Sequence, residues 1–217
     1  MPCSILRIFS VIVALTFATA AAAGAEGTRL MAFGDSLVHG YGLAEDDTFP
    51  AQLQAALQQQ GHAVEVLNAG NSGDTTAAGL ARLDWALADR PDAVIIVLGA
   101  NDGLRGLEPR QTYSNLTAIL ERLEADGLPV LLAGMLAPRN LGTDYAEDFD
   151  AVFPRLAARH TVAFYPFFLE GVAMEPELNQ PDGIHPNAAG VAVIVQSIMP
   201  EVARLIDSIA AGQAADG

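Results

Sequence analysis

The stretch Arg29-Leu30-Met31-Ala32-Phe33-Gly34-Asp35-Ser36-Leu37 passes from a short apolar run directly into a polar turn. A continuous apolar run of this length is typical of a strand that is buried on both faces of a parallel sheet. The turn after it leads into a helix, where the backbone N–H of Ser36 can point at a bound oxyanion. We therefore expect an α/β fold that presents Ser36 on a strand-to-helix turn, although a serine there can also simply cap the helix.

Apolar runs continue to alternate with helical periodicity along the 217 residues. Further strands are expected at 64–68, 93–98 and 130–134, with a weaker fifth at 162–164. Helices are expected at 49–60, 76–88, 111–126, 145–159 and 188–210, with Thr48 as an N-cap and Gly61 as a C-terminal stop. This alternation predicts one three-layer α/β/α sandwich around a mainly parallel, five-stranded sheet.

The N-terminal segment differs in composition from the rest of the chain. Arg7 precedes an apolar run at 8–23 and a small-x-small site at Ala23-Gly24-Ala25, which is typical of a signal peptide cleaved after Ala25. The run is shorter than a membrane-spanning helix, so a periplasmic or secreted protein without a stable membrane anchor is expected. The expected organisation is a signal peptide at 1–25, one domain at 26–211 and a loose tail at 212–217.

Charge and cysteine content limit the possible partners and chemistry. The formal net charge is −15 and the chain contains no lysine, so nucleic acid is not an expected partner. The single cysteine, Cys3, lies in the expected leader, which would leave the mature protein without disulfide or thiolate chemistry. The oligomeric state is left open.

Polar turns follow three of the expected strands. Gly34-Asp35-Ser36 follows the first, 68–73 the second and 99–102 the third. Since ligands bind beyond the carboxyl ends of parallel strands, these turns are expected to meet at one edge of the sheet. The loop at 182–185 precedes the last helix and can reach the same edge.

Ser36, Asp182 and His185 supply the groups that a serine nucleophile needs. A hydroxyl requires an imidazole to take its proton and a carboxylate to orient the imidazole. Asp182 lies three residues before His185, close enough to accept from its ring, whereas His39 has no such acid and is expected at the pocket rim. His62 and His160 lack a comparable setting too.

Gly73 and Asn101 are candidate oxyanion-hole donors beside the Ser36 N–H. A glycine N–H is unobstructed by a side chain, and an asparagine amide is a fixed donor. Both residues are also common in turns, where they serve the backbone only. Asp35 and Asp102 are expected to brace the loops through hydrogen bonds.

Four ordered blocks then indicate a family. The chain has no Gly-x-Ser-x-Gly, so the nucleophile elbow of ordinary α/β-hydrolases is excluded. Instead Gly34-Asp-Ser-Leu37, Asn68-Ala-Gly-Asn-Ser-Gly-Asp-Thr-Thr76, Gly99-Ala-Asn-Asp102 and Asp182-Gly-Ile-His-Pro186 resemble the SGNH (GDSL) hydrolases, from about residue 29 to residue 201. They are similar to the exported bacterial thioesterase, arylesterase and lysophospholipase branch.

The resemblance implies a flavodoxin-like sheet, no metal and no cofactor. It implies Ser36 as nucleophile, His185 as base and Asp182 as its partner, with the Ser36 N–H, Gly73 N–H and Asn101 amide as oxyanion donors. Val38-His39, Asn71 and Ala100 depart from the family pattern, which puts substrate preference in doubt. The implied substrates are small-molecule esters and thioesters of short-to-medium acyl chains, including aryl esters, acyl-CoA and lysophospholipids.

Three other functions are compatible with parts of the sequence. The chain could be a phosphoesterase that uses a divalent metal, because carboxylates and imidazoles are suitable ligands. The candidate ligands would be Asp35, His39, Asp102, Asp182 and His185. The fold could serve as a non-catalytic periplasmic binding protein, or the same serine chemistry could deacetylate a carbohydrate. An acyl groove would favour lipid or aryl substrates. Apolar residues at helix and loop positions usually serve the core, but those that could line a groove are Leu104, Leu107, Leu136, Leu141, Phe149 and Phe153.

Overall fold

The structure is a computed structural model that describes residues 27–215. Its sheet has five parallel strands in the order β2-β1-β3-β4-β5. The strands are β1 (Thr28–Gly34), β2 (Val64–Gly70), β3 (Ala93–Val97), β4 (Val130–Ala133) and β5 (Ala163–Tyr165). The predicted parallel sheet, including its weak fifth strand, is confirmed. The expected signal peptide at 1–25 and its cleavage site lie outside the described residues.

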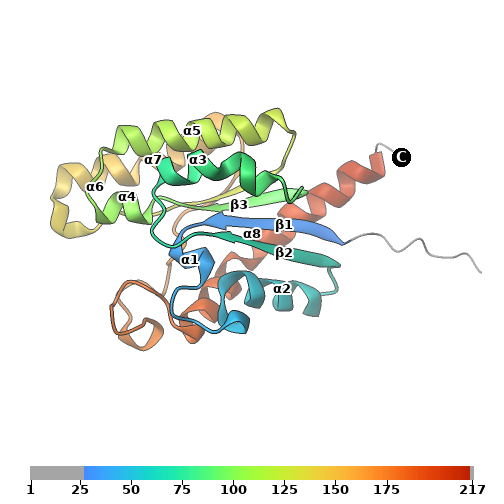
Figure 1. The fold of residues 1–217 in the computed structure, drawn as a ribbon, viewed down its shortest axis with the longest axis horizontal. Helices are drawn as coiled ribbons and strands as arrows, with labels where there is room; N and C mark the ends of the chain where they lie inside the picture. The colour runs from blue at the N-terminus through green and yellow to red at the C-terminus, as the bar shows by residue number, and fades with distance from the viewer. Residues whose placement is uncertain (1–26, 216–217) are drawn as a thin grey trace, which may run out of the picture.

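Helices cover both faces of the sheet (Figure 1). One face carries α1 (Ser36–His39), α2 (Phe49–Gln59) and α8 (Ala188–Ala215). The other face carries α3 (Thr76–Leu87), α5 (Pro109–Ala125) and α7 (Val152–His160), with α4 (Ala100–Leu104) and α6 (Thr143–Asp150) beside them. Short 3-10 turns lie at η1 (Glu45–Asp47), η2 (Arg139–Leu141) and η3 (Pro176–Leu178). This is the predicted three-layer α/β/α sandwich.

The core lies on the two faces of the central strands. All of β3 is buried, and β1 is buried from Leu30 onward, which is why both strands are continuous apolar runs in the sequence. Helix α8 is apolar over Ala188–Ile209, and half of that window is buried. It packs against α2 and the strands β3, β4 and β5.

The helix expected at 145–159 is in fact two helices, α6 and α7, which meet at Ala151. Pro154 has no N–H, so it cannot bond to the carbonyl of Asp150 as a continuous helix would require. A proline is tolerated in a first turn, where that N–H has no intrahelical partner. The second helix therefore begins at Val152.

The predicted positions of both ends of α2 are confirmed. Thr48 occupies the N-cap position of α2, but its side chain makes no capping hydrogen bond, because its hydroxyl donates to the Glu45 carbonyl at 2.9 Å instead. Gly61 follows the end of α2 with a φ of +90°, as a C-terminal stop requires. Helix α8 continues to Ala215, beyond the helix end predicted at residue 210, as the helix preference of its alanines favours.

Candidate active site

Ser36 is the first residue of α1, directly after the end of β1. Asp35 caps the helix by accepting from the Leu37 N–H at 3.0 Å. Gly34 is required before it, because a Cβ there would lie 2.5 Å from the Val97 carbonyl oxygen. The predicted strand-to-helix turn is therefore present, and it is Asp35, not Ser36, that caps the helix.

Ser36, His185 and Asp182 form a continuous hydrogen-bonded chain. The Nε2 atom of His185 lies 2.9 Å from Ser36 Oγ, and Nδ1 lies 2.7 Å from Asp182 Oδ2. The other oxygen of Asp182 accepts from the backbone N–H groups of Ile184 and His185 at 3.0 and 3.1 Å. The hydrogen bond from His185 is the main reason that the pKa of Asp182 falls to about 2. Asp182 is thus held as an anion that orients the imidazole.

The imidazole of His185 is also flanked by an aromatic ring and an apolar recess. Tyr41 lies against it with ring centroids 4.7 Å apart. The recess beside the Ser36–His185 pair is lined by apolar side chains from α1, α2, α8 and the loop between α1 and α2: Leu37, Leu43, Phe49, Val191 and Ile194. These contacts restrict the space around the two reacting atoms.

The loops that carry Gly73 and Asn101 meet at the same edge of the sheet. The Asn101 amide donates to the Asp74 carbonyl at 3.0 Å and to Asp35 Oδ2 at 3.3 Å. Gly73 has a φ of +86°. A Cβ built at this position would have Arg105 Nη2, at 3.9 Å, as its nearest neighbour. Arg105 in turn donates to the Gly73 carbonyl at 2.9 Å. An unobstructed N–H and a fixed amide are thus placed beside the Ser36 turn.

Two carboxylates at this edge are fully buried and brace the loops, as expected. Asp102 accepts from the Thr76 N–H at 2.8 Å and from the hydroxyls of Thr76 and Thr112 at 2.5 and 3.2 Å. Asp35 is 0% exposed, and its burial raises its pKa to about 6. Its hydrogen bonds from Leu37 and Asn101 oppose that shift.

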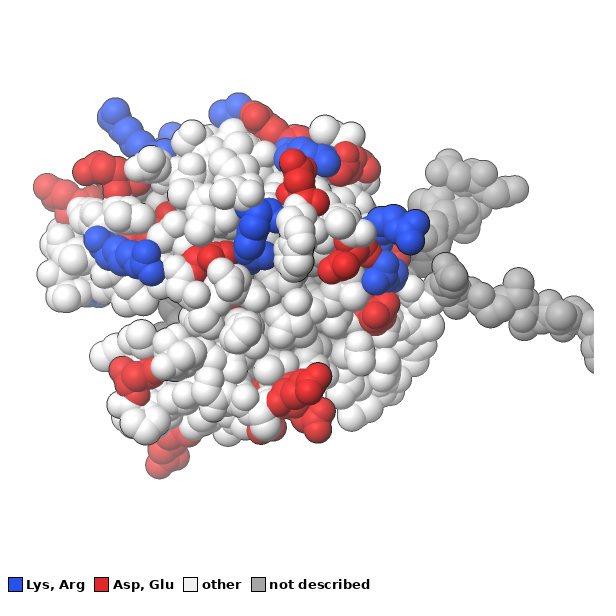
Figure 2. Space-filling model, in the orientation of Figure 1, with Lys and Arg blue, Asp and Glu red and all other residues white. Residues whose placement is uncertain are grey.

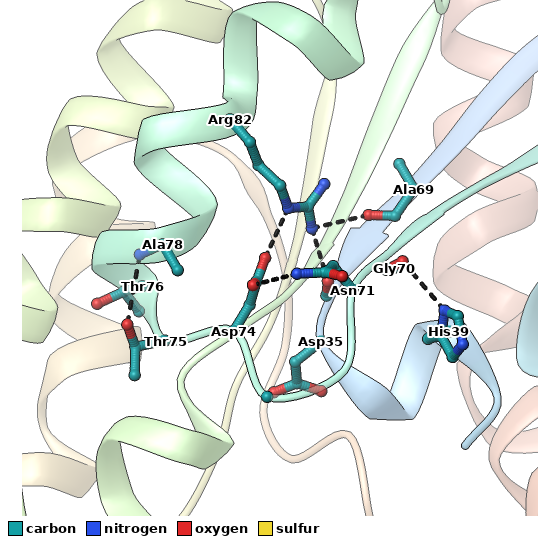
Figure 3. Close-up of polar contacts among 12 residues, drawn as sticks. Asp35, His39, Ala69, Gly70, Asn71, Asp74, Thr75, Thr76, Ala78 and Arg82 are labelled. Carbon is teal, nitrogen blue, oxygen red and sulfur yellow. Dashed lines mark hydrogen bonds and ion pairs between the residues drawn. The ribbon is translucent and has the colours of Figure 1, made fainter. Parts of the chain in front are cut away.

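The sequence analysis missed Arg82, which ties three segments of the site together (Figure 3). Its Nε donates to Asp74 Oδ2 at 2.6 Å, and its Nη2 donates to the carbonyls of Gly34 and Ala69 at 2.8 and 2.9 Å. The guanidinium also stands 4.3 Å from the centre of the Phe33 ring. Asn71 completes the group by donating to Asp74 Oδ1 at 2.5 Å. The available signal was that Arg82 is the single cation of a mostly apolar helix.

Comparison with known proteins shows the family of this chain. The model of the GDSL-like lipase/acylhydrolase family matches residues 32–193, which is more than half of the chain. The chain belongs to the GDSL-like lipase/acylhydrolase family. This confirms the resemblance predicted from the four sequence blocks.

Relatives of this GDSL-like hydrolase have esterase and thioesterase names. It is 38% identical over 200 residues to thioesterase 1/protease 1/lysophospholipase L1 of Escherichia coli K12, covering 92% of both chains. It is 36% identical over 200 residues to an arylesterase of Vibrio mimicus, covering 92% of this chain and 98% of that one. The crystal structure of TesA superposes with a TM-score of 0.78 at 41% identity, covering 82% of this chain and 99% of that one.

The metal-binding alternative does not match the side-chain arrangement of this GDSL-like hydrolase. Within residues 27–215, no three His, Cys, Asp or Glu side chains gather as a metal site requires. Asp102 is engaged by threonines and Asp182 by His185. His39 is exposed and its Nδ1 lies 3.4 Å from the Gly70 carbonyl, whereas the imidazole that reaches Ser36 Oγ is that of His185.

The residues expected to line an acyl groove divide into two groups. Phe149 and Phe153 are buried in the core with their rings edge-to-face at 5.8 Å, so these two serve the core and not a groove. The four leucines lie beyond the ends of β3 and β4 and are exposed: Leu104, Leu107, Leu136 and Leu141. Their apolar side chains therefore remain available at the catalytic edge of this GDSL-like hydrolase.

Proposed function

We propose that this protein is a serine hydrolase that cleaves carboxylic esters and thioesters, with Ser36 as nucleophile, His185 as general base and Asp182 as the orienting acid. The observation that carries the proposal is the chain of two short hydrogen bonds from Asp182 through His185 to Ser36. Such a chain is the arrangement that activates a serine hydroxyl at neutral pH.

The reaction proceeds through an acyl-enzyme. Ser36 Oγ attacks the carbonyl carbon while His185 Nε2 takes its proton, and Asp182 stabilises the imidazolium that forms. The tetrahedral intermediate collapses, the alcohol or thiol leaves with the proton from His185, and the acyl group remains on Ser36. Water then attacks the acyl group with His185 again as base, and the carboxylic acid leaves.

The negative oxygen of each tetrahedral intermediate is bound by the N–H groups of Ser36 and Gly73 and by the Asn101 amide. Donors that are already in place stabilise this charge without rearranging during the reaction. The hydrogen bonds of Asn101 to Asp35 and Asp74 and of Arg105 to Gly73 support this assignment, because they fix the two loops beside Ser36.

The expected substrates are aryl esters, acyl thioesters and lysophospholipids with short-to-medium acyl chains. The names of the relatives support this class, and the exposed leucines at the catalytic edge supply apolar surface for an acyl chain. We also propose that the protein is exported after cleavage of residues 1–25. Arg and acidic side chains are interspersed on the face of the described residues drawn in Figure 2, which suits a small-molecule partner better than nucleic acid.

Substitution of Ser36 by Ala tests the serine mechanism. Hydrolysis of a p-nitrophenyl ester should fall on the order of 10⁴–10⁶-fold in kcat, because no acyl-enzyme can form. A phosphonate should add stoichiometrically to Ser36 of the wild type, as seen by intact mass. Near-wild-type turnover by folded Ser36→Ala would overturn the proposal.

The substrate class is tested with the same wild-type protein on a panel of p-nitrophenyl esters, acyl-CoA and acetylated xylose. Each methylene that enters the groove should favour binding by roughly 0.8 kcal/mol, so kcat/KM should rise with chain length and then level off. Faster turnover of the acetylated sugar without a gain from chain length would instead identify a carbohydrate deacetylase.

A further inference from the structure

Ser36 and His185 are 149 residues apart, yet their reacting atoms lie within 2.9 Å. His185 lies on a loop that is closed by one antiparallel bridge between Asn179 and Pro186. Because a loop of this kind can shift as a unit, the Ser36–His185 distance needs a contact that joins the loop to the nucleophile turn.

Gln180 makes that contact from the base of the loop. Its backbone N–H donates to the His185 carbonyl at 2.7 Å. Its side-chain Nε2 donates to two carbonyls, that of Pro186 at 3.0 Å and that of Tyr41 at 2.7 Å. Since an amide NH₂ has two protons in one plane, both donors are used and the two carbonyls are held at a set spacing.

The Tyr41 side of this bridge leads directly to the nucleophile. The Tyr41 N–H donates to the carbonyl of Ser36 at 3.2 Å, and its ring lies against His185. Gly42 packs on the same amide, since a Cβ there would stand 2.3 Å from Gln180 Oε1. Gln180 is thus linked to the backbone of Ser36 through Tyr41, and it is hydrogen-bonded directly to the backbone of His185.

We propose that Gln180 is a positioning residue that sets the distance and angle between Ser36 and His185 by bridging the carbonyls of Tyr41 and Pro186. This inference rests on the proposed serine mechanism. Gln180 is hydrogen-bonded to neither Ser36 Oγ nor His185 Nε2. Its loss should therefore act indirectly, by changing the geometry of the proton transfer between these two atoms, and should not remove a substrate contact.

Replacement of Gln180 by Met or Glu removes the bridge at similar side-chain length. Met donates nothing, and an ionised Glu places a carboxylate opposite two carbonyl oxygens, so Glu should be at least as damaging. Displacing a catalytic group by about 1 Å costs about 100-fold in rate. We expect kcat for a p-nitrophenyl ester to fall about 10- to 100-fold, with KM changed less than about twofold and phosphonate inactivation of Ser36 slowed in parallel.

The matched controls are Gln58→Met and Gln58→Glu. Gln58 Nε2 also donates to a backbone carbonyl, that of Val64 at 3.1 Å, but at the opposite end of the sheet. These variants should keep the wild-type kcat and inactivation rate, with folding of every variant followed by circular dichroism and thermal unfolding.

The outcomes separate this inference from the proposed function. If Ser36→Ala is inactive while folded Gln180 variants keep the wild-type kcat, the positioning role is wrong and the serine mechanism stands. A rise in KM alone would also overturn the positioning role. If the Met and Glu variants do not fold, Gln180→Asn decides, because it keeps the amide but shortens its reach, and wild-type kcat in that variant would contradict the bridge.

Discussion

The amide of Asn101 has two N–H groups, and both are engaged. One donates to the Asp74 carbonyl at 3.0 Å and the other to Asp35 Oδ2 at 3.3 Å. An oxyanion formed at Ser36 must therefore share or replace one of them, and the longer bond to Asp35 is the weaker competitor. In the proposed mechanism, Asp35 orients the amide before the reaction and is replaced as its acceptor by the oxyanion that forms.

Replacement of Asn101 by Ala should lower kcat for ester hydrolysis by about 10²–10³-fold with little change in KM. The reason is that the donor acts on charge that exists only in the transition state. Steady-state kinetics of the purified variant measures this. If the loss in kcat/KM came equally from a lower kcat and a higher KM, Asn101 would bind the substrate in the ground state as well. An unchanged kcat would contradict its role in the oxyanion hole.

Helix α3 contributes Arg82 to the site. Its guanidinium joins the end of β1, the end of β2 and the loop that carries Gly73. The Arg82 side chain is only 19% exposed and that of Asp74 only 7%, so these bonds are protected from water. Because a planar guanidinium donates in several fixed directions, a lysine cannot reproduce the three contacts.

We expect Arg82→Lys to lower the free energy of unfolding by about 1.5–3 kcal/mol, as hydrogen bonds to charged groups usually contribute. It should also lower kcat, on the order of tenfold, because the Gly73 loop is less firmly held. Urea unfolding and p-nitrophenyl ester kinetics measure the two effects.

Arg122→Lys is the matched control for that variant. Arg122 pairs with Asp84 and Asp126 on the surface with 40% of its side chain exposed, so its replacement should change stability by less than about 1 kcal/mol and leave kcat unchanged. Identical behaviour of the two variants would contradict a role of α3 in holding the oxyanion loop.

The free energy of unfolding depends on pH through two aspartates that contribute in opposite directions. Folding raises the pKa of Asp35 from 3.8 to about 6, mainly by burial. Its contribution is therefore fully present below pH 3.8 and is lost as the pH rises through about 6. Folding lowers the pKa of Asp182 from 3.8 to about 2, so its contribution is present above 3.8 and is lost as the pH falls toward 2.

Replacement of Asp35 by Asn should remove the first of these dependences. The free energy of unfolding of Asp35→Asn minus that of the wild type should rise by about 2 kcal/mol between pH 4 and pH 7 and then level off, since one pKa unit corresponds to about 1.4 kcal/mol and the rise already begins below pH 4. Urea unfolding at each pH measures it. Asp182→Asn is the control, with a constant difference over this range, and a flat difference for Asp35→Asn would contradict the raised pKa.

Local patterns in the sequence determined the fold class and most members of the site. Residues 93–98 predict a doubly buried strand because every side chain there must avoid water on both faces, and this holds in any parallel sheet. Ser36, Gly73, Asn101 and the pair Asp182 and His185 stand out because their residue types and spacing follow from local chemistry. The split at Ala151 was also present in the sequence, as Pro154, and was not recognised.

Only the tertiary structure decided which partners these side chains have. Arg82, Asp74 and Gln180 are ordinary polar residues in the sequence, and their roles depend on carbonyls contributed by segments far along the chain. Phe149 and Phe153 illustrate the same limit, because the sequence alone does not separate an apolar residue that lines a groove from one that packs in the core. Burial and long-range hydrogen bonds are properties of packing, so the bond between Gln180 and Tyr41, 139 residues apart, has no local signature.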